Sequence, residues 1–170
     1  MSIRIAYFGT RNNEAKKSRL DRIDRIQRMM DLNQELSRIC SEYGIADLYV
    51  FGSQAAEIAA LARNEAVEVT RPESDADFGI LPESKGIWPP EKTADLAAEL
   101  EDLLDVPRVD LVFLPRADPF LAVDIIRGEL LYTSDADRQA EYELFVLRRA
   151  SDLIPFQRER VRMILEEGAR

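Results

Sequence analysis

Three short apolar runs alternate with segments of helical periodicity, and this alternation restricts the chain to an α/β (α+β) architecture. The expected strands lie at residues 45–51, 75–81 and 108–114, with a further short strand at 130–132. Helices are expected at residues 20–43, 54–63, 91–104, 119–127 and 135–167. Gly44 and Gly128 are suitable stop signals for two of these helices, and Pro155 could break the last one.

Length and composition indicate one domain with few catalytic options. The chain has 170 residues, of which 20–170 are expected to form the domain and 1–19 an extension. It has no histidine and only one cysteine, Cys40, which excludes histidine-dependent triads, histidine metal sites and cysteine-based zinc sites. No apolar run has the length of a membrane span and no signal peptide is recognised, so we expect a cytoplasmic protein. A net charge of −9 argues against direct binding of a nucleic-acid backbone.

Two carboxylates stand two residues apart at the start of an apolar strand. Side chains alternate along a strand, so Asp75 and Asp77 point the same way while Ala76 and Phe78 point into a core. Parallel carboxylates repel each other unless a cation lies between them. Oxygen ligands of this kind suit Mg²⁺. A solvated turn is the alternative interpretation of an isolated D-x-D motif.

The chain contains an internal control for this motif. The same tetrapeptide, Ser-Asp-Ala-Asp, recurs at residues 134–137, where a helical segment follows it. There Ser134 can serve as the N-cap, and Asp135 and Asp137 suit the positive end of the helix dipole. The second copy thus has a structural explanation, whereas acids at the start of an apolar strand cap nothing.

A third carboxylate, Asp110, is the only acid among the apolar residues of the third strand. If that strand neighbours the second one, three carboxylates converge, and three acids can hold two metal ions about 4 Å apart for nucleotidyl transfer. The alternative is that Asp110 simply pairs with Arg108 at a sheet edge. Gly52 and Ser53 lie where the first strand meets a helix, and such a junction can bind phosphate.

This ordered set resembles the nucleotidyltransferase fold of the DNA polymerase β superfamily, a small mixed sheet flanked by helices. Within it, the chain is similar to the minimal nucleotidyltransferases of prokaryotic toxin–antitoxin pairs, the MntA-type antitoxins. The matching segments are FGSQA (51–55), RPESDAD (71–77), VDLV (109–112) and PFLAVDIIRGELLY (119–132). The likeness covers roughly residues 30–165.

Two features depart from the family pattern. Twenty-one residues separate Ser53 from Asp75, about double the usual spacing, and residues 57–69 account for the extra length. Gln54 stands where the family commonly has an arginine, so a phosphate contact is missing or has moved to Arg63 or Arg71.

The resemblance implies transfer of AMP from ATP to a hydroxyl, typically a tyrosine of a cognate HEPN-type RNase toxin. It further implies that Asp75, Asp77 and Asp110 are catalytic and bind two Mg²⁺ ions. Gly52 and Ser53 would hold the β- and γ-phosphates, with Arg71 as an additional candidate for phosphate contact.

Two other functions stay open. One is transfer to a small molecule, as in aminoglycoside nucleotidyltransferases, although the chain is short for that class. The other is a non-catalytic antitoxin that acts by binding its toxin. An acidic chain suits a basic partner. The apolar stripe of the last helix, from Phe145 to Ile164, is either a docking surface or, as we expect for most of it, part of the core.

Overall fold

The computed structural model of the chain describes residues 32–63, 65 and 74–168. The expected extension at 1–19, the start of the first predicted helix, Arg71 and five residues of the 57–69 insertion (64 and 66–69) lie outside these described residues. Four strands form one mixed sheet in the order β3-β2-β1-β4. They are β1 (Ile45–Phe51), β2 (Ala76–Pro82), β3 (Val109–Phe113) and β4 (Glu129–Thr133). β2 and β3 are parallel, while β1 is antiparallel to both β2 and β4.

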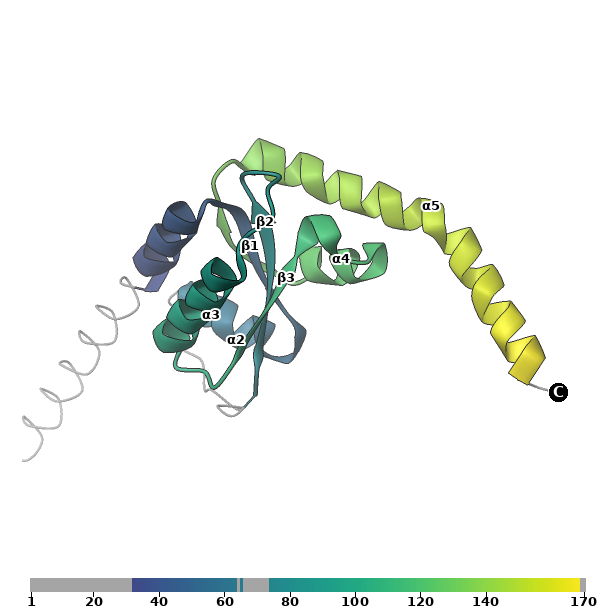
Figure 1. Cartoon of the computed structure of the whole chain (residues 1–170), viewed down its shortest axis with the longest axis horizontal. Helices are drawn as coiled ribbons and strands as arrows, with labels where there is room; N and C mark the ends of the chain where they lie inside the picture. The colour runs from purple at the N-terminus through teal and green to yellow at the C-terminus, as the bar shows by residue number, and fades with distance from the viewer. Residues whose placement is uncertain (1–31, 64, 66–73, 169–170) are drawn as a thin grey trace, which may run out of the picture.

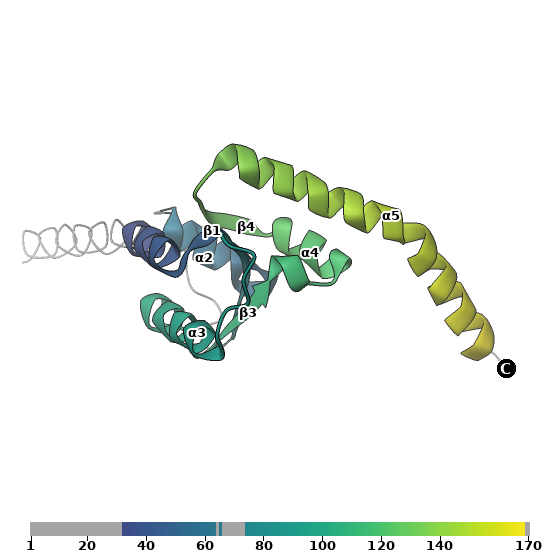
Figure 2. The ribbon, with the colours of Figure 1, turned by 45° about the horizontal axis from the view of Figure 1, so that its top comes forward.

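Helices cover both faces of the sheet (Figures 1 and 2). Residues 32–43, α2 (Ala55–Ala62) and α3 (Pro90–Leu104) pack on one face, where Leu36, Ile58 and Leu96 are buried in the larger core cluster. On the other face lie α4 (Pro119–Ile126) and the first half of α5 (Ala136–Gly168), with Ile125 and Val146 buried in a second cluster. A mixed sheet with helices packed on both faces confirms the predicted α+β fold. The helices supply the apolar cover that each face of the sheet needs.

The predicted strands agree closely with the observed ones. β1 has the expected bounds, and β2 begins one residue later than expected, at Ala76. Along β2, Ala76, Phe78 and Ile80 enter the larger core cluster, as the alternation predicted. Short 3-10 helices follow two strands: η1 (Gly52–Gln54) after β1 and η2 (Leu114–Arg116) after β3.

The last helix corrects one expectation. α5 continues through Pro155, and residues 151–166 are all exposed (Figure 1). Within residues 136–166, for which side-chain burial is described, the buried residues of α5 are Val146 and Ala150 in its first half. The expectation that most of the apolar stripe from Phe145 to Ile164 belongs to the core is therefore wrong, because Phe145 and Leu147 in the first half are exposed as well. Among the described helices, none combines the length and apolar character that crossing a membrane requires.

A buried charge in β1 gives a prediction about stability. The Asp47 side chain is fully buried, and this burial raises its pKa, while the nearby Thr133 hydroxyl and Arg138 charge offset part of the rise. The folded state therefore holds the Asp47 proton more tightly than the unfolded state does. Its unfavourable contribution is fully present above the folded pKa and is relieved as pH falls through that value.

We expect Asp47→Asn to raise the free energy of unfolding by about 1–2 kcal/mol at pH 7, because the amide removes a desolvated charge. The advantage over wild type should shrink as pH is lowered through the raised pKa of Asp47, because the wild-type carboxyl then becomes protonated in the fold. Urea denaturation at a series of pH values measures this. A variant less stable than wild type at pH 7 would show that Thr133 and Arg138 more than compensate the burial.

Candidate active site

The turn after β1 brings the backbone against the acid pair. Gly52 has φ of +78°, a conformation that favours glycine. A Cβ atom added at Gly52 would lie 2.7 Å from Oδ2 of Asp77, too close for any other residue without a shift. Phe51 and Asp77 are register partners in the β1–β2 ladder. The Gly-Ser turn and the second acid of the D-x-D motif are therefore in contact, despite the long segment between them.

The strand adjacency on which the Asp110 prediction depended is confirmed. β2 and β3 are parallel, and Asp77 and Asp110 are paired in register. Val109 and Leu111, the neighbours of Asp110, pack toward the larger core cluster, which leaves Asp110 on the other face. Asp75 immediately precedes β2 and is exposed. All three predicted acids thus lie at one end of the β2–β3 pair.

Arg108 connects two of these acids. Its guanidinium lies 3.1 Å from the Asp75 carboxylate and 2.5 Å from the Asp110 carboxylate. The alternative interpretation, that Asp110 pairs with Arg108, is therefore correct about this ion pair. It does not exclude the predicted cluster, because the same arginine reaches Asp75 as well. Sequence reasoning missed that second contact.

The Asp77 carboxyl is subject to the negative charges of the two other acids. Burial raises the pKa of its carboxyl, and the neighbouring Asp110 and Asp75 raise it further, with Arg108 opposing them. A cation beside Asp77 would relieve this repulsion.

The three acids do not form a closed metal site in the described structure. In the side-chain conformations present, no three acidic groups among residues 32–63, 65 and 74–168 come together closely enough to hold a metal ion. Arg108 lies between Asp75 and Asp110 in these conformations. The donors are nevertheless of the type that Mg²⁺ prefers, and the absence of a Cβ at Gly52 keeps room beside Asp77. The residues therefore suit a divalent cation once the exposed Arg108 side chain turns away.

Gln54 has a structural role that the sequence did not reveal. Its side chain is buried, and its Nε2 donates hydrogen bonds to the Ser74 backbone carbonyl and, at 2.6 Å, to the Ser74 hydroxyl. This contact joins the residue after Ser53 to the residue before Asp75. Gln54 and Ser74 are the first and last of the 21 residues between Ser53 and Asp75, so their hydrogen bonds join the two ends of this segment. Gln54 thus holds the two halves of the motif together.

Arg63 and Arg71 are the two arginines predicted to supply the missing phosphate contact, and the structure describes only Arg63. Arg63 forms an ion pair with Glu129 on β4, so its guanidinium is paired with a carboxylate outside the predicted acid cluster. Arg71 lies outside the described residues, and its role stays a prediction. Ser53 is exposed in η1, next to Gly52.

The second Ser-Asp-Ala-Asp copy caps a helix, as predicted, with one correction. Asp135, rather than Ser134, is the cap: its Oδ1 accepts hydrogen bonds from the backbone N–H groups of Asp137 and Arg138, each at 3.1 Å. The Ser134 hydroxyl instead accepts a hydrogen bond from the Arg138 guanidinium at 2.7 Å. The two identical strings therefore occupy different structural environments.

Comparison with known proteins identifies the class. The chain matches the sequence model "Polymerase beta, Nucleotidyltransferase" over residues 34–137, more than half of its length. It therefore belongs to the polymerase beta nucleotidyltransferase family. No curated protein sequence matches it significantly.

Solved structures of toxin–antitoxin complexes share the fold. One, a toxin–antitoxin with AMP-PNP, aligns with a TM-score of 0.58 and 17% identity, covering 78% of this chain and 98% of that one. A mutant of an MntA toxin–antitoxin complex gives the same TM-score and coverage at 16% identity. A third, a tri-AMPylated Shewanella oneidensis HEPN toxin with its MNT antitoxin, aligns with a TM-score of 0.54 and 20% identity, covering 84% of this chain and 99% of that one.

Proposed function

We propose that this chain is an antitoxin that transfers AMP from ATP to a tyrosine hydroxyl of a HEPN-type RNase toxin. One observation carries the proposal: Asp77 lies beside Asp110 and against Gly52 in a nucleotidyltransferase fold. The similar complexes support the choice of donor and acceptor, because one contains AMP-PNP and another an AMPylated HEPN toxin. A reaction that consumes ATP points to the cytoplasm as the compartment.

In this proposal Asp75, Asp77 and Asp110 would hold two Mg²⁺ ions. Magnesium, when bound, would neutralise charge on the triphosphate and lower the pKa of the attacking hydroxyl. The acids are suited to this task because their own charges are close together and incompletely compensated by Arg108. Asp77 and Asp110 on their strands, with Asp75 just before β2, would orient the reactants without covalent catalysis.

The Gly-Ser turn would bind the leaving part of ATP. Gly52 offers a backbone free of a Cβ atom, Ser53 an exposed hydroxyl, and Arg71 is a candidate for a further phosphate contact. The acceptor oxygen would form a bond to the α-phosphorus as the bond to the bridging oxygen breaks. Pyrophosphate would leave, and the proton of the acceptor hydroxyl would pass to solvent.

Arg108 gives a prediction that does not depend on activity. It must leave Asp75 and Asp110 before they can hold a cation, so its two ion pairs oppose metal binding. Exposed ion pairs of this kind are weak, so the gain in metal affinity on removing them is modest. We therefore expect Arg108→Gln to bind Mn²⁺ about threefold to tenfold more tightly than wild type in a calorimetric titration. Unchanged or weaker binding would show that Arg108 does not compete for these acids.

The second half of α5 suits the proposed partner. It projects from the domain (Figures 1 and 2) and carries large apolar side chains in solvent, including Phe156, which is 72% exposed. Large apolar side chains gathered on an exposed surface typically mark a protein interface. The net charge of −9 would favour association with a basic toxin.

A non-catalytic antitoxin is the second candidate, and the Arg108 bridge is the observation that favours it. An arginine between Asp75 and Asp110 provides the positive charge that would otherwise come from a metal ion. In that case the protein would act by contact alone, and its acids would serve the fold.

One experiment separates these functions. The protein is incubated with labelled ATP and Mg²⁺, with and without the product of the adjacent gene, and with an aminoglycoside as an alternative acceptor. Label on the partner protein supports the proposed antitoxin. Tight complex formation without label supports the non-catalytic antitoxin, and label on the aminoglycoside supports a small-molecule transferase.

A further inference from the structure

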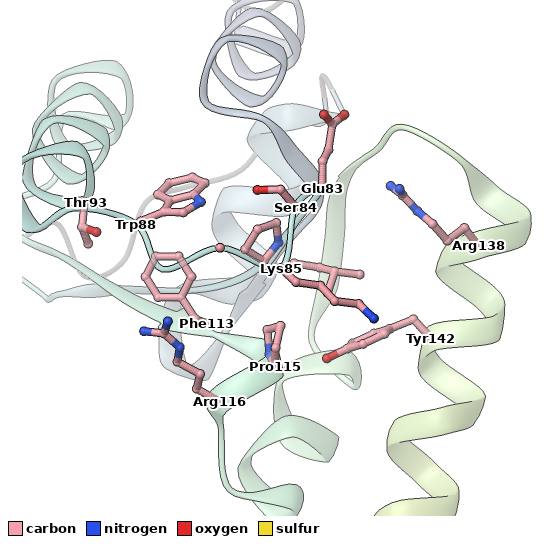
Figure 3. A pocket seen from close by; sticks show the side chains of 13 residues that line it. Glu83, Ser84, Lys85, Trp88, Thr93, Phe113, Pro115, Arg116, Arg138 and Tyr142 are labelled. Carbon is pink, nitrogen blue, oxygen red and sulfur yellow. The ribbon is translucent and has the colours of Figure 1, made fainter.

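A cavity of about 490 Å³ lies at the opposite end of the sheet from the three acids. Its walls come from the end of β2, the loop at 83–88, the end of β3 with η2, and the first turns of α5 (Figure 3). Leu81, which lines it, is four residues along β2 from Asp77, a separation of about 13 Å. The volume falls in the range of about 300–1,000 Å³ typical of small-molecule sites. The cavity is therefore distinct from the candidate active site.

Aromatic side chains form two walls of this cavity. Trp88 and Phe113 stand on one side, and Tyr142 of α5 on the other (Figure 3). Phe113 packs edge-on against Trp88, with ring centroids 5.3 Å apart. The Lys92 ammonium lies 3.9 Å from the Trp88 ring centroid, and it donates a hydrogen bond to the Tyr43 carbonyl at 2.7 Å. These contacts fix the indole, so a planar ligand would meet a preformed wall.

Positive charge surrounds the cavity although the chain as a whole is acidic. Lys85, Arg116 and Arg138 line it, and Glu83 is the one carboxylate among the lining residues that the structure describes. Arg138 is held by Ser134 and faces the buried charge of Asp47, so part of its charge is compensated. Lys85 and Arg116 therefore supply most of the attraction for an anion.

We propose that this cavity binds a planar anion of mononucleotide size, a ring joined to a phosphate. The ring would lie against the wall of Trp88 and Phe113. Lys85 and Arg116, whose charged ends lie on opposite sides of the cavity in Figure 3, would attract the phosphate by their charge without forming a single clamp. Proteins that bind single-stranded nucleic acid stack each base on an aromatic side chain and hold the phosphates with cationic side chains. This site is independent of the proposed transferase activity, because none of its residues belongs to the acid cluster or the Gly-Ser turn.

Trp88 reports on the cavity directly, since it is the only tryptophan in the chain. Titration with AMP, in the presence of a chelator so that no divalent metal is bound, should produce a saturable change in tryptophan fluorescence. Lys85→Ala combined with Arg116→Ala should weaken AMP binding at least tenfold. Arg158→Ala combined with Arg160→Ala removes the same charge from exposed positions of α5 and should leave the affinity unchanged.

Additional titrations show which part of AMP is recognised and at which site it binds. Adenosine and inorganic phosphate, each lacking half of the ligand, should bind at least tenfold more weakly than AMP. Asp77→Asn combined with Asp110→Asn should leave AMP affinity unchanged, and a loss there would overturn the proposal by placing the ligand at the acids. The proposal is also wrong if the tryptophan fluorescence does not saturate with AMP. It is equally wrong if the cavity double variant and the α5 double variant bind AMP with the same affinity while both melt at the wild-type temperature.

Discussion

Asp77→Asn is expected to lower the rate of nucleotidyl transfer about a thousandfold while leaving the protein at least as stable as wild type. Asparagine preserves the shape of the side chain but removes the charge that would hold the metal ions. Stabilisation of several kcal/mol in the transition state is lost with it, and about 4 kcal/mol corresponds to roughly a thousandfold in rate. Burial and the neighbouring Asp110 and Asp75 raise the pKa of Asp77, so removing its charge also relieves repulsion in the fold.

The second Ser-Asp-Ala-Asp copy supplies a matched control. Asp137 stands in the same position of the same tetrapeptide, but in the first turn of α5, and Asp137→Asn should leave the transfer rate within about twofold of wild type. Asp135→Asn should cost less than about 1 kcal/mol of stability, because asparagine is itself a good N-cap. Transfer rates and melting temperatures of the three variants are compared. An inactive Asp137→Asn protein that melts normally would contradict our separation of the two copies.

The second large effect is expected on partner binding. Leu153→Ser combined with Ile164→Ser should weaken the complex with the cognate toxin about a hundredfold. The two residues are eleven positions apart, three helical turns, so they lie on the same side of α5, and both are exposed. Burying a leucine and an isoleucine together contributes about 3–6 kcal/mol, and half of that corresponds to roughly a hundredfold in affinity.

Arg162→Ser combined with Glu166→Ser is the control for this prediction. It places the same two serines on the opposite side of the same helix, and it leaves the net charge unchanged. Both residues are exposed and interact with each other at the limit of an ion pair, 4.0 Å. Affinity is measured by calorimetry with the purified toxin. Equal affinities for the two double variants would show that the Leu153 side of α5 is not the interface.

Local patterns predicted the strands and the direction of their side chains. Alternation along β2 correctly placed Ala76, Phe78 and Ile80 in the core, and Asp110 on the other face of its strand from Val109 and Leu111. Comparison of the two Ser-Asp-Ala-Asp copies also separated a helix cap from a candidate site, although the capping residue is Asp135. These predictions succeed because side-chain periodicity and capping depend on residues close in sequence.

Contacts between distant residues could not be predicted in the same way. The hydrogen bonds from Gln54 to Ser74 span the inserted segment, and no spacing rule indicates them. The contact of Arg108 with Asp75 depends on the register of β2 against β3. The exposure of the second half of α5 could not be predicted from the sequence either. An apolar stripe on a helix has the same period whether it faces a core or a partner.

The central claim, nucleotidyl transfer to a partner protein, is tested most directly by the fate of the individual phosphates of ATP. The protein is incubated with Mg²⁺ and its cognate toxin, using ATP labelled at the α-phosphate in one reaction and at the γ-phosphate in another. We predict stable label on a toxin tyrosine from the α-phosphate only, and no label with Asp77→Asn. Label from the γ-phosphate would show phosphorylation instead, and a tight complex without label from either would contradict catalysis by this chain.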